Sequence, residues 1–322
     1  MLRSALLYLS NQPQVFSFVR HNRLAKHLAM RFVAGESADE ALAAVRQLNA
    51  RGASASLDLL GESVTNEAEA RATRDAYLHL LDRLQDQRLD ANVSVKLTAL
   101  GLDISEDLCV ALMHDVLGRA REHGNFVRID MESSAYTERT LQLFEERLYP
   151  TYKNHVGIVL QSYLYRTFAD VERANQLRCR VRLCKGAYKE PASVAYPDKR
   201  QVDENYVRSM HALMMNGNYP GLATHDRRII NEAKRYAQQQ RIAPERFEFQ
   251  MLYGVRRDLQ EQLVRDGYRM RVYVPFGTQW YPYLMRRLAE RPANVAFITG
   301  NVFREMVAGR GRRGGRGARR QP

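Results

Sequence analysis

Cysteine is scarce in this chain, with three residues among 322, at Cys109, Cys179 and Cys184. Their spacing fits neither a metal-binding pattern nor a disulfide framework, which excludes a zinc module and a small disulfide-stabilised domain. Apolar runs stop well short of the roughly 18 residues that a membrane-spanning helix requires. These absences favour a globular protein of the reducing cytoplasm, with a chain long enough to bury a large core.

Basic residues outnumber acidic ones, and the formal net charge is +13. Six of the arginines lie in residues 309–322, which hold no acidic residue, so the rest of the chain carries +7. We predict that this Arg/Gly tail is disordered, because it is too charged and too poor in apolar residues to pack. A basic tail also suits RNA or anionic lipid, so an RNA-binding protein is an alternative from a different functional class.

The first 52 residues predict helices. Apolar residues recur at helical spacing from Val15 to Phe32. A second helix begins at a capping box formed by Ser37 and Glu40 and ends at Gly52.

After residue 53 short apolar runs, often β-branched, alternate with helical stretches. The runs are 56–60, 93–97, 126–131, 156–161, 181–185, 221–225, 247–252 and 270–275. Strands that alternate with helices predict right-handed βα units and a parallel sheet. Eight units in about 240 residues match a closed (β/α)8 barrel. A doubly wound open sheet is the alternative, but no G-x-G-x-x-G or Walker sequence follows any run.

The predicted architecture is therefore an α/β fold in three parts. A helical segment covers residues 1–52, a TIM-like (β/α)8 barrel covers 53–308, and the Arg/Gly tail covers 309–322.

Polar residues recur at the ends of the predicted strands. A barrel enzyme places its working groups there and in the loops just beyond. Seven runs end in this way, and the first is followed by Glu62; the seven ends carry Lys96, Asp130, Gln161, Lys185, Thr224 with His225, Gln250 and Tyr273. Each residue alone has a structural explanation, but their recurrence in one position predicts a ligand site.

A helix is also predicted after the eighth run, over residues 283–290. It places Tyr283, Arg286, Arg287 and Glu290 on one stripe. The stripe is either a solvated face with an Arg286–Glu290 pair or a paired-arginine clamp for a carboxylate or phosphate.

The strand ends and this helix together form a strongly cationic set. Two guanidiniums suit a carboxylate, and Lys185-Gly186-Ala187 offers charge and close backbone approach for a phosphate. No cluster fits a metal, no serine or cysteine nucleophile is supported, and Cys184 is interpreted as a small core residue. The residues alone predict a barrel that binds an anionic cofactor and a small carboxylate, with the reaction left open.

Eight motifs make the chain resemble the bacterial monofunctional proline dehydrogenases over about residues 10–300. The motifs are LDLLGE (57–62), VSVKL (93–97), IDME (129–132), VLQSYLYR (159–166), RLCKGAY (182–188), ATHD (223–226), FEFQMLYG (247–254) and YLMRRLAE (283–290). The resemblance implies a TIM-like barrel with a catalytic helix after the eighth strand. It also implies FAD-dependent oxidation of L-proline to Δ1-pyrroline-5-carboxylate, with hydride transfer to the flavin N5.

The resemblance implies a set of substrate-binding residues. Arg286 and Arg287 would hold the proline carboxylate with help from Lys96, and Tyr273 and Tyr283 would line the ring pocket. Glu290 belongs to the same group, and Glu62 would pair with Arg286 as a gate over the substrate.

Two residues are expected to have catalytic roles. Asp130 would support Lys96 and the substrate pocket, and Arg182 would lie beside the flavin N5, where negative charge develops. The residues expected to hold FAD are Met131, Gln161, Lys185, Gly186, Ala187, Thr224, His225 and Gln250.

The resemblance also implies partners and a location. Electrons would pass to a membrane quinone, and a pyrroline-5-carboxylate dehydrogenase would take the product. The enzyme would be cytoplasmic, with peripheral association on the inner face of the cell membrane, and nucleic acid is not expected as a partner.

A flavin barrel acting on another cyclic or N-alkyl amino acid is a further alternative. The long connection after Tyr188 is expected to form a lid or a surface excursion.

Overall fold

A computed structural model describes residues 30–290. They divide between two compact units, each described by itself: Val33–Thr278, and a second unit that contains helix α13. The predicted helices before residue 30 and the tail 309–322 lie outside the described residues.

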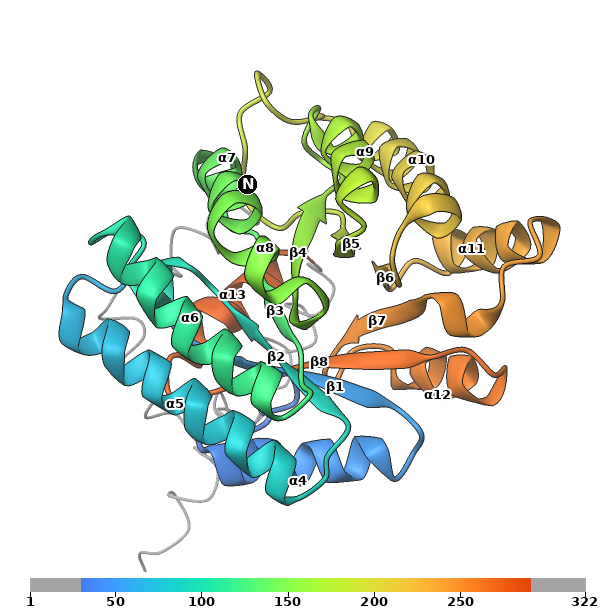
Figure 1. Cartoon of the computed structure of the whole chain (residues 1–322). Coiled ribbons are helices and arrows are strands. Elements are labelled where there is room, and N and C mark those ends of the chain that lie inside the picture. The colour runs from blue at the N-terminus through green and yellow to red at the C-terminus, as the bar shows by residue number, and fades with distance from the viewer. Residues whose placement is uncertain (1–29, 291–322) are drawn as a thin grey trace, which may run out of the picture. The chain divides into compact units, whose positions relative to one another are not determined.

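Eight parallel strands of the first unit close into a barrel in sequence order (Figure 1). The strands are β1 (Ser54–Leu59), β2 (Ala91–Val95), β3 (Val127–Ile129), β4 (Val156–Gln161), β5 (Arg180–Cys184), β6 (Gly221–Ala223), β7 (Glu248–Leu252) and β8 (Met270–Phe276). The barrel closes where β1 pairs with β8, in a register from Ser54 opposite Arg271 to Leu59 opposite Phe276. The predicted (β/α)8 barrel is confirmed.

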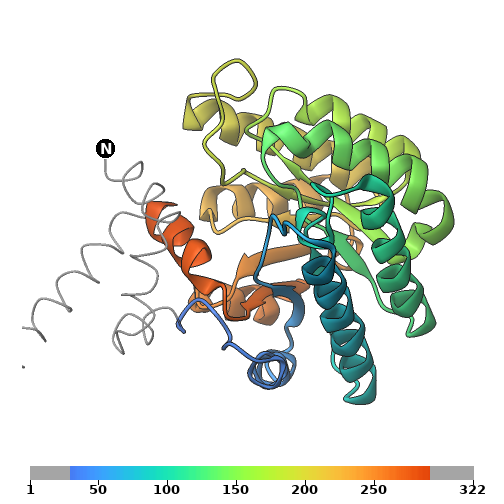
Figure 2. The ribbon, with the colours of Figure 1, turned by 90° about the vertical axis from the view of Figure 1, so that its left-hand side faces the viewer.

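The helices surround the strands, and α5 and α6 lie side by side on the wall (Figure 2). They are α4 (Ala38–Asn49), α5 (Glu67–Asp86), α6 (Glu106–Glu122), α7 (Ser134–Leu143), α8 (Tyr149–Tyr152), α9 (Thr167–Leu177), α10 (Lys199–Asn216), α11 (Arg227–Gln239) and α12 (Arg257–Arg265), with α13 (Trp280–Glu290) in the other unit. Short helical turns are η1 (Thr98–Leu100), η2 (Phe144–Leu148), η3 (Lys153–His155) and η4 (Pro244–Arg246).

Helix α4 precedes the barrel and packs against β1 and β8. It begins at the predicted capping box: the Glu40 N–H donates to Ser37 Oγ at 3.3 Å, and the Ser37 N–H donates to Glu40 Oε2 at 3.1 Å. These bonds satisfy donors that the first helical turn leaves unpaired. A helix that comes before the first strand therefore covers the seam where the barrel closes.

The strands alternate between two environments. Leu57, Val93, Ile129 and Val272 are fully buried against the helices, and this layer is the hydrophobic core. The alternate residues point into the barrel and are mostly polar or charged. Their contacts cross the barrel, because Arg182 on β5 bonds residues from β1, β2 and β7. Barrels usually fill this space with branched apolar residues.

A glycine on β4 makes room for this polar interior. A Cβ on Gly157 would lie 2.3 Å from the Arg180 carbonyl oxygen and 2.7 Å from Arg128 Nη1. Arg128 uses the space to donate to the carbonyl oxygens of Ile158 at 3.0 Å and Arg180 at 2.6 Å. A side chain at residue 157 would break this arrangement.

We expect Gly157→Ala to lower the free energy of unfolding by about 1–3 kcal/mol, because backbone must move to admit the methyl group. That corresponds to a fall in Tm of about 2–4 °C per kcal/mol in thermal unfolding. The control is Gly118→Ala in α6, where a Cβ meets nothing within 4 Å. It should raise stability by about 0.4–1 kcal/mol. Equal stability of the two variants would contradict the close approach at Gly157.

Candidate functional site

Several predicted site residues of the barrel unit lie at the carboxyl ends of its strands, whereas Gln250 and Tyr273, which were predicted at strand ends, lie within β7 and β8. All eight strands are parallel, so these ends lie at the same mouth of the barrel. Lys96 follows β2 and Asp130 follows β3. Gln161 ends β4, and Thr224 follows β6.

Arg182 is the centre of the polar interior. Its Nη1 donates to Asp130 Oδ1 at 2.6 Å and its Nε to Gln250 Oε1 at 2.5 Å. Nη2 lies 3.2 Å from the hydroxyl oxygens of both Ser56 and Ser94. Arg182 is 6% exposed, and its guanidinium donates four hydrogen bonds: to Ser56, Ser94 and Gln250 on three strands and to Asp130 just after β3.

Asp130 bonds two predicted site residues at once. One carboxylate oxygen accepts from Arg182, and the other accepts from the Tyr273 hydroxyl at 2.8 Å. The Tyr273 ring also lies under the guanidinium, with Arg182 Cζ 5.2 Å from the ring centroid. Burial and the nearby carboxylates raise the pKa of Tyr273, so its hydroxyl keeps its proton and acts as a donor.

The expectation that Asp130 supports Lys96 stays a prediction, because Asp130 helps to raise the pKa of Lys96 but the hydrogen bonds of Lys96 go to another carboxylate. Lys96 Nζ instead donates to Asp58, at 3.1 and 3.3 Å from the two carboxylate oxygens. Asp58 lies opposite Ser94 in the register of β1 and β2, which places it beside Lys96. Burial alone would lower the pKa of Lys96, but Asp58 raises it above its ordinary value, so the ammonium stays charged.

Gln161 is a predicted cofactor residue with an unused acceptor. Its Nε2 donates to the carbonyl oxygen of Glu132 at 3.2 Å and lies 3.4 Å from that of Met131. Its Oε1 is buried and has no hydrogen-bond partner among the described residues. A buried acceptor without a partner costs about 1–3 kcal/mol, which a bound donor would recover.

Thr224 and His225 have defined partners just beyond β6. The Thr224 hydroxyl oxygen accepts from the Asp226 N–H at 3.1 Å, and His225 Nε2 accepts from the Leu252 N–H at 3.0 Å. The strand β6 ends at Ala223, so residues 224 and 225 lie just outside the predicted strand, although the Thr224 N–H still donates to the Gln250 carbonyl oxygen at 3.1 Å. In its neutral form His225 therefore carries its ring proton on Nδ1.

Lys185 lies between two carboxylates on neighbouring helices. Its Nζ is 2.5 Å from Asp203 Oδ1 and 3.0 Å from Asp226 Oδ2. Burial would raise the pKa of Asp226, but Lys185 lowers it below its ordinary value. The next residue, Gly186, has φ of 105° and contacts the Tyr163 ring, which lies 2.4 Å from where a Cβ would be. The adjacent Ala187 is half-buried.

The predicted helix over residues 283–290 is confirmed as part of α13. Within it, Arg287 Cζ lies 5.2 Å from the centroid of the Tyr283 ring. The side chains of Arg286 and Glu290 lie outside the described part of the structure, and Glu62 is half-buried in the barrel unit after β1. The predicted clamp and the Glu62–Arg286 gate therefore stay predictions.

The long connection from β5 to α10 was expected to be a lid or a surface excursion. It is hydrogen-bonded to the loop after β4. Leu164 and Ala195 form an antiparallel bridge, and the Tyr165 hydroxyl donates to the Ala192 carbonyl oxygen at 2.8 Å. Glu190 accepts from the Ser134 N–H at 2.8 Å. Figures 1 and 2 show that this connection extends beyond the neighbouring helices.

Sequence reasoning missed the charged residues that lie deeper in the barrel. These are Asp58 on β1, Glu248 on β7 and Arg271 on β8. The buried serines Ser56 and Ser94, whose hydroxyls are hydrogen-bonded to each other, were also missed. The signal was present, because residues 54–59, which form β1, read Ser-Ala-Ser-Leu-Asp-Leu, with every second residue polar. In a parallel barrel, that alternation indicates a polar interior.

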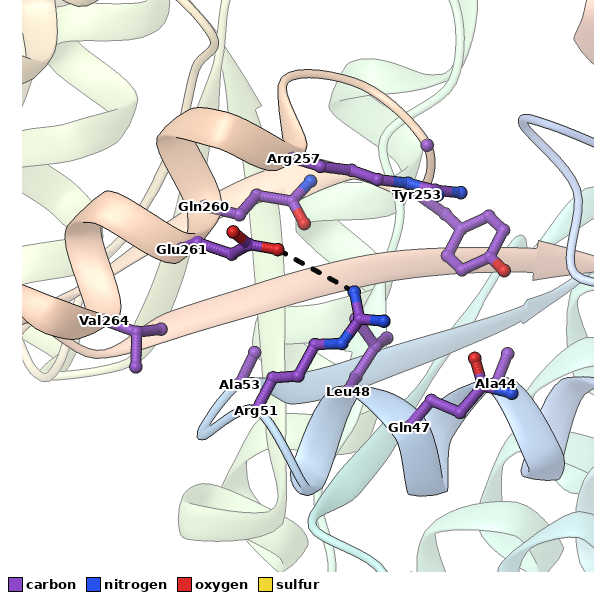
Figure 3. A pocket seen from close by; sticks show the side chains of 11 residues that line it. Ala44, Gln47, Leu48, Arg51, Ala53, Tyr253, Arg257, Gln260, Glu261 and Val264 are labelled. Atoms are coloured by element: carbon purple, nitrogen blue, oxygen red, sulfur yellow. Dashed lines mark ion pairs between the residues drawn. The ribbon is translucent and has the colours of Figure 1, made fainter.

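A surface pocket lies away from this site, between α4 and α12 (Figure 3). An exposed ion pair, Arg51 with Glu261 at 3.8 Å, crosses it, and none of the predicted site residues lines it. Exposed pairs of this kind contribute little to stability.

Between residues 30 and 290, no three His, Cys, Asp or Glu residues are grouped so that they could hold a metal ion. Over the same residues, no helix combines the length and apolar character that crossing a membrane requires.

Comparison with known families identifies the barrel. A family model described as proline dehydrogenase matches residues 41–300. The chain belongs to the proline dehydrogenase family. The predicted family and enzyme class, an oxidoreductase acting on proline, are thereby confirmed.

Relatives match almost the whole chain. The proline dehydrogenase of Deinococcus radiodurans is 42% identical over 307 residues, which cover 94% of this chain and 98% of the relative. Proline dehydrogenase 2 of Bacillus subtilis (strain 168) is 41% identical over 295 residues, covering 92% and 96%.

A solved structure supports the barrel. Proline utilization A from Bdellovibrio bacteriovorus, inactivated by N-propargylglycine, matches with a TM-score of 0.79 and 31% identity. The match covers 86% of this chain and 34% of that protein, so this chain spans about a third of its length.

The Asp58–Lys96 pair should show strong coupling in a double-mutant cycle. Asp58→Asn leaves the Lys96 ammonium buried without its carboxylate, and we expect a loss of about 3–5 kcal/mol in the free energy of unfolding. Lys96→Met should cost a similar amount. The double variant Asp58→Asn/Lys96→Met should cost clearly less than the sum, measured by denaturant unfolding. Additivity within about 0.5 kcal/mol would show that the two side chains do not interact.

Proposed function

We propose that the protein is an FAD-dependent proline dehydrogenase that oxidises L-proline to Δ1-pyrroline-5-carboxylate. The family match over residues 41–300 is the observation that carries this proposal. The polar barrel mouth supports it, since a redox cofactor needs placement and electrostatics rather than a nucleophile.

The barrel residues suit a flavin nucleotide. Gln161 offers a buried acceptor without a partner, Arg182 offers a fixed cation, and Lys185 offers a further charge near Gly186. The residues proposed to hold FAD are Met131, Gln161, Lys185, Gly186, Ala187, Thr224, His225 and Gln250. When bound, FAD supplies the hydride acceptor.

The protein's own residues would bind and orient proline. Arg286 and Arg287 would take its carboxylate as a bidentate clamp, with Lys96 as a third cation. Tyr273 and Tyr283 would pack against the ring, and we propose that Glu62 and Glu290 complete this group.

Electrostatics would favour the reactive form of the substrate. The secondary ammonium of proline must lose a proton before hydride can leave the adjacent carbon. A cationic barrel mouth would disfavour that ammonium, as like charges do, and so favour the neutral amine. Lys96 and Arg182 contribute less to this effect than free cations would, because each is paired with a carboxylate. Asp58 and Asp130 are both committed to ion pairs, so we assign neither as the base and propose that water takes the proton.

The electrons would pass to a membrane quinone, and a pyrroline-5-carboxylate dehydrogenase would use the product. We place the enzyme in the cytoplasm with peripheral attachment to the inner face of the membrane. Surface cations contribute roughly 1 kcal/mol each toward anionic lipid, and flotation with anionic liposomes tests this location.

The absorbance spectrum of the purified protein tests the proposal. We expect a yellow protein that bleaches on anaerobic addition of L-proline and recovers its colour with a soluble quinone. Removal of residues 309–322 should not change this, whereas an RNA-binding protein would be colourless and lose nucleic-acid affinity with its tail. Faster bleaching by hydroxyproline or sarcosine than by proline would point to a different substrate.

The arginine clamp can be tested by Arg287→Lys. We expect KM for proline to rise more than tenfold, because lysine cannot reproduce a bidentate contact with the carboxylate. Steady-state kinetics at saturating quinone measures this. An unchanged KM would remove Arg287 from the carboxylate site.

A further inference from the structure

A chain of buried hydrogen bonds runs from Arg182 into the barrel and ends at Glu248. We propose that Glu248 is a positioning residue that orients the amide of Gln250 and, through it, fixes the Arg182 guanidinium. The consequence for the reaction rests on the proposed function, which places Arg182 beside the cofactor.

The distances define the direction of each bond in this chain. Arg182 Nε donates to Gln250 Oε1 at 2.5 Å, and Gln250 Nε2 donates to Glu248 Oε1 at 2.6 Å. The exposed fractions of Gln250 and Glu248 are 4% and 3%. With the amide reversed, one contact would bring two donors together and the other two acceptors. The carboxylate therefore selects one orientation of the amide, and that orientation presents an acceptor to Arg182.

Glu248 is held firmly enough to impose this choice. Arg271 Nε donates to the same oxygen at 2.8 Å, and the Tyr219 hydroxyl donates to Oε2 at 3.0 Å. Burial alone would raise the pKa of Glu248, but Arg271 and Gln250 lower it to about 2. The side chain is thus an ionised acceptor at any working pH and cannot donate to Gln250.

The neighbouring strand leaves space for the amide in this position. A Cβ on Gly221 of β6 would lie 2.4 Å from Gln250 Nε2. Gln250 is also proposed to hold FAD, and each end of its amide makes one of the contacts inside the barrel described above. Its contacts therefore support a role that acts through Arg182.

The simpler explanation is that Glu248 only neutralises Arg271. The double variant Glu248→Met/Arg271→Met separates the two roles, because it removes both charges together with the acceptor that faces Gln250. It also leaves no unpaired buried arginine at residue 271. Glu248→Gln alone leaves Arg271 unpaired and risks misfolding. The matched control is Tyr219→Phe, which deletes a hydrogen bond to the other oxygen of Glu248 and leaves the Gln250 contact intact.

We expect the double variant to fold and to bind flavin, with KM for proline within about threefold of the wild type. Its kcat should fall at least tenfold, because the Gln250 amide can then reverse and Arg182 Nε loses its fixed acceptor. The midpoint potential of the bound flavin should fall by about 30 mV, which equals a tenfold loss in stabilisation of the two-electron reduced form. Tyr219→Phe should stay within twofold of the wild-type kcat.

A readout without flavin keeps the inference separate from the proposed function. The Arg182 Nε–H, followed by nitrogen-15 NMR and assigned by its loss in Arg182→Lys, should exchange with water at least tenfold faster in the double variant. If the double variant keeps the wild-type kcat, flavin midpoint potential and Nε–H exchange rate, the positioning role is wrong. An equal loss of kcat in Tyr219→Phe would also contradict it. A wild-type protein without flavin would overturn the proposed function, while the exchange rates would still decide whether Glu248 positions Arg182.

Discussion

The Arg182–Asp130 ion pair in the middle of the barrel is the interaction around which the interior is arranged. A guanidinium with 6% exposure costs several kcal/mol to bury unless its donors are satisfied. Strands β1, β2 and β7 therefore carry Ser56, Ser94 and Gln250 at inward positions, where apolar residues would pack in most barrels. The hydrophobic core is displaced outward, to the layer between strands and helices.

The apolar layer between strands and helices and the polar interior of the barrel contribute to the protein in different ways. The outer layer of Leu57, Val93, Ile129 and their neighbours stabilises the fold by burial, which is not directional. The inner layer is directional, since it is made of hydrogen-bonded ion pairs: Arg271 with Glu248, Arg182 with Asp130, and Lys96 with Asp58. A cation fixed in this way stabilises developing charge without reorganising during the reaction.

Much of the fold could be predicted from the sequence, because strands that alternate with capped helices leave few alternatives. β4 has the predicted bounds, and the predicted capping box at Ser37 is present. Pairing inside the barrel could not be predicted in the same way. Asp58 rather than Asp130 bonds Lys96 because of the register between β1 and β2, and no local pattern encodes that register. The roles of the α13 residues remain predictions.

Closure of the barrel between β1 and β8, covered by α4, has a consequence for synthesis on the ribosome. Ser56 emerges early, but Gln250 and Tyr273 emerge more than 190 residues later, about 10–40 s at ordinary elongation rates. Until Gln250 has been synthesised, Arg182 on β5 lacks one of its hydrogen-bond acceptors. Until β8 has been synthesised, the two edges of the open sheet stay unpaired. The polar interior can therefore be completed only after β7 and β8 have been synthesised, through contacts that are among the most distant in the sequence.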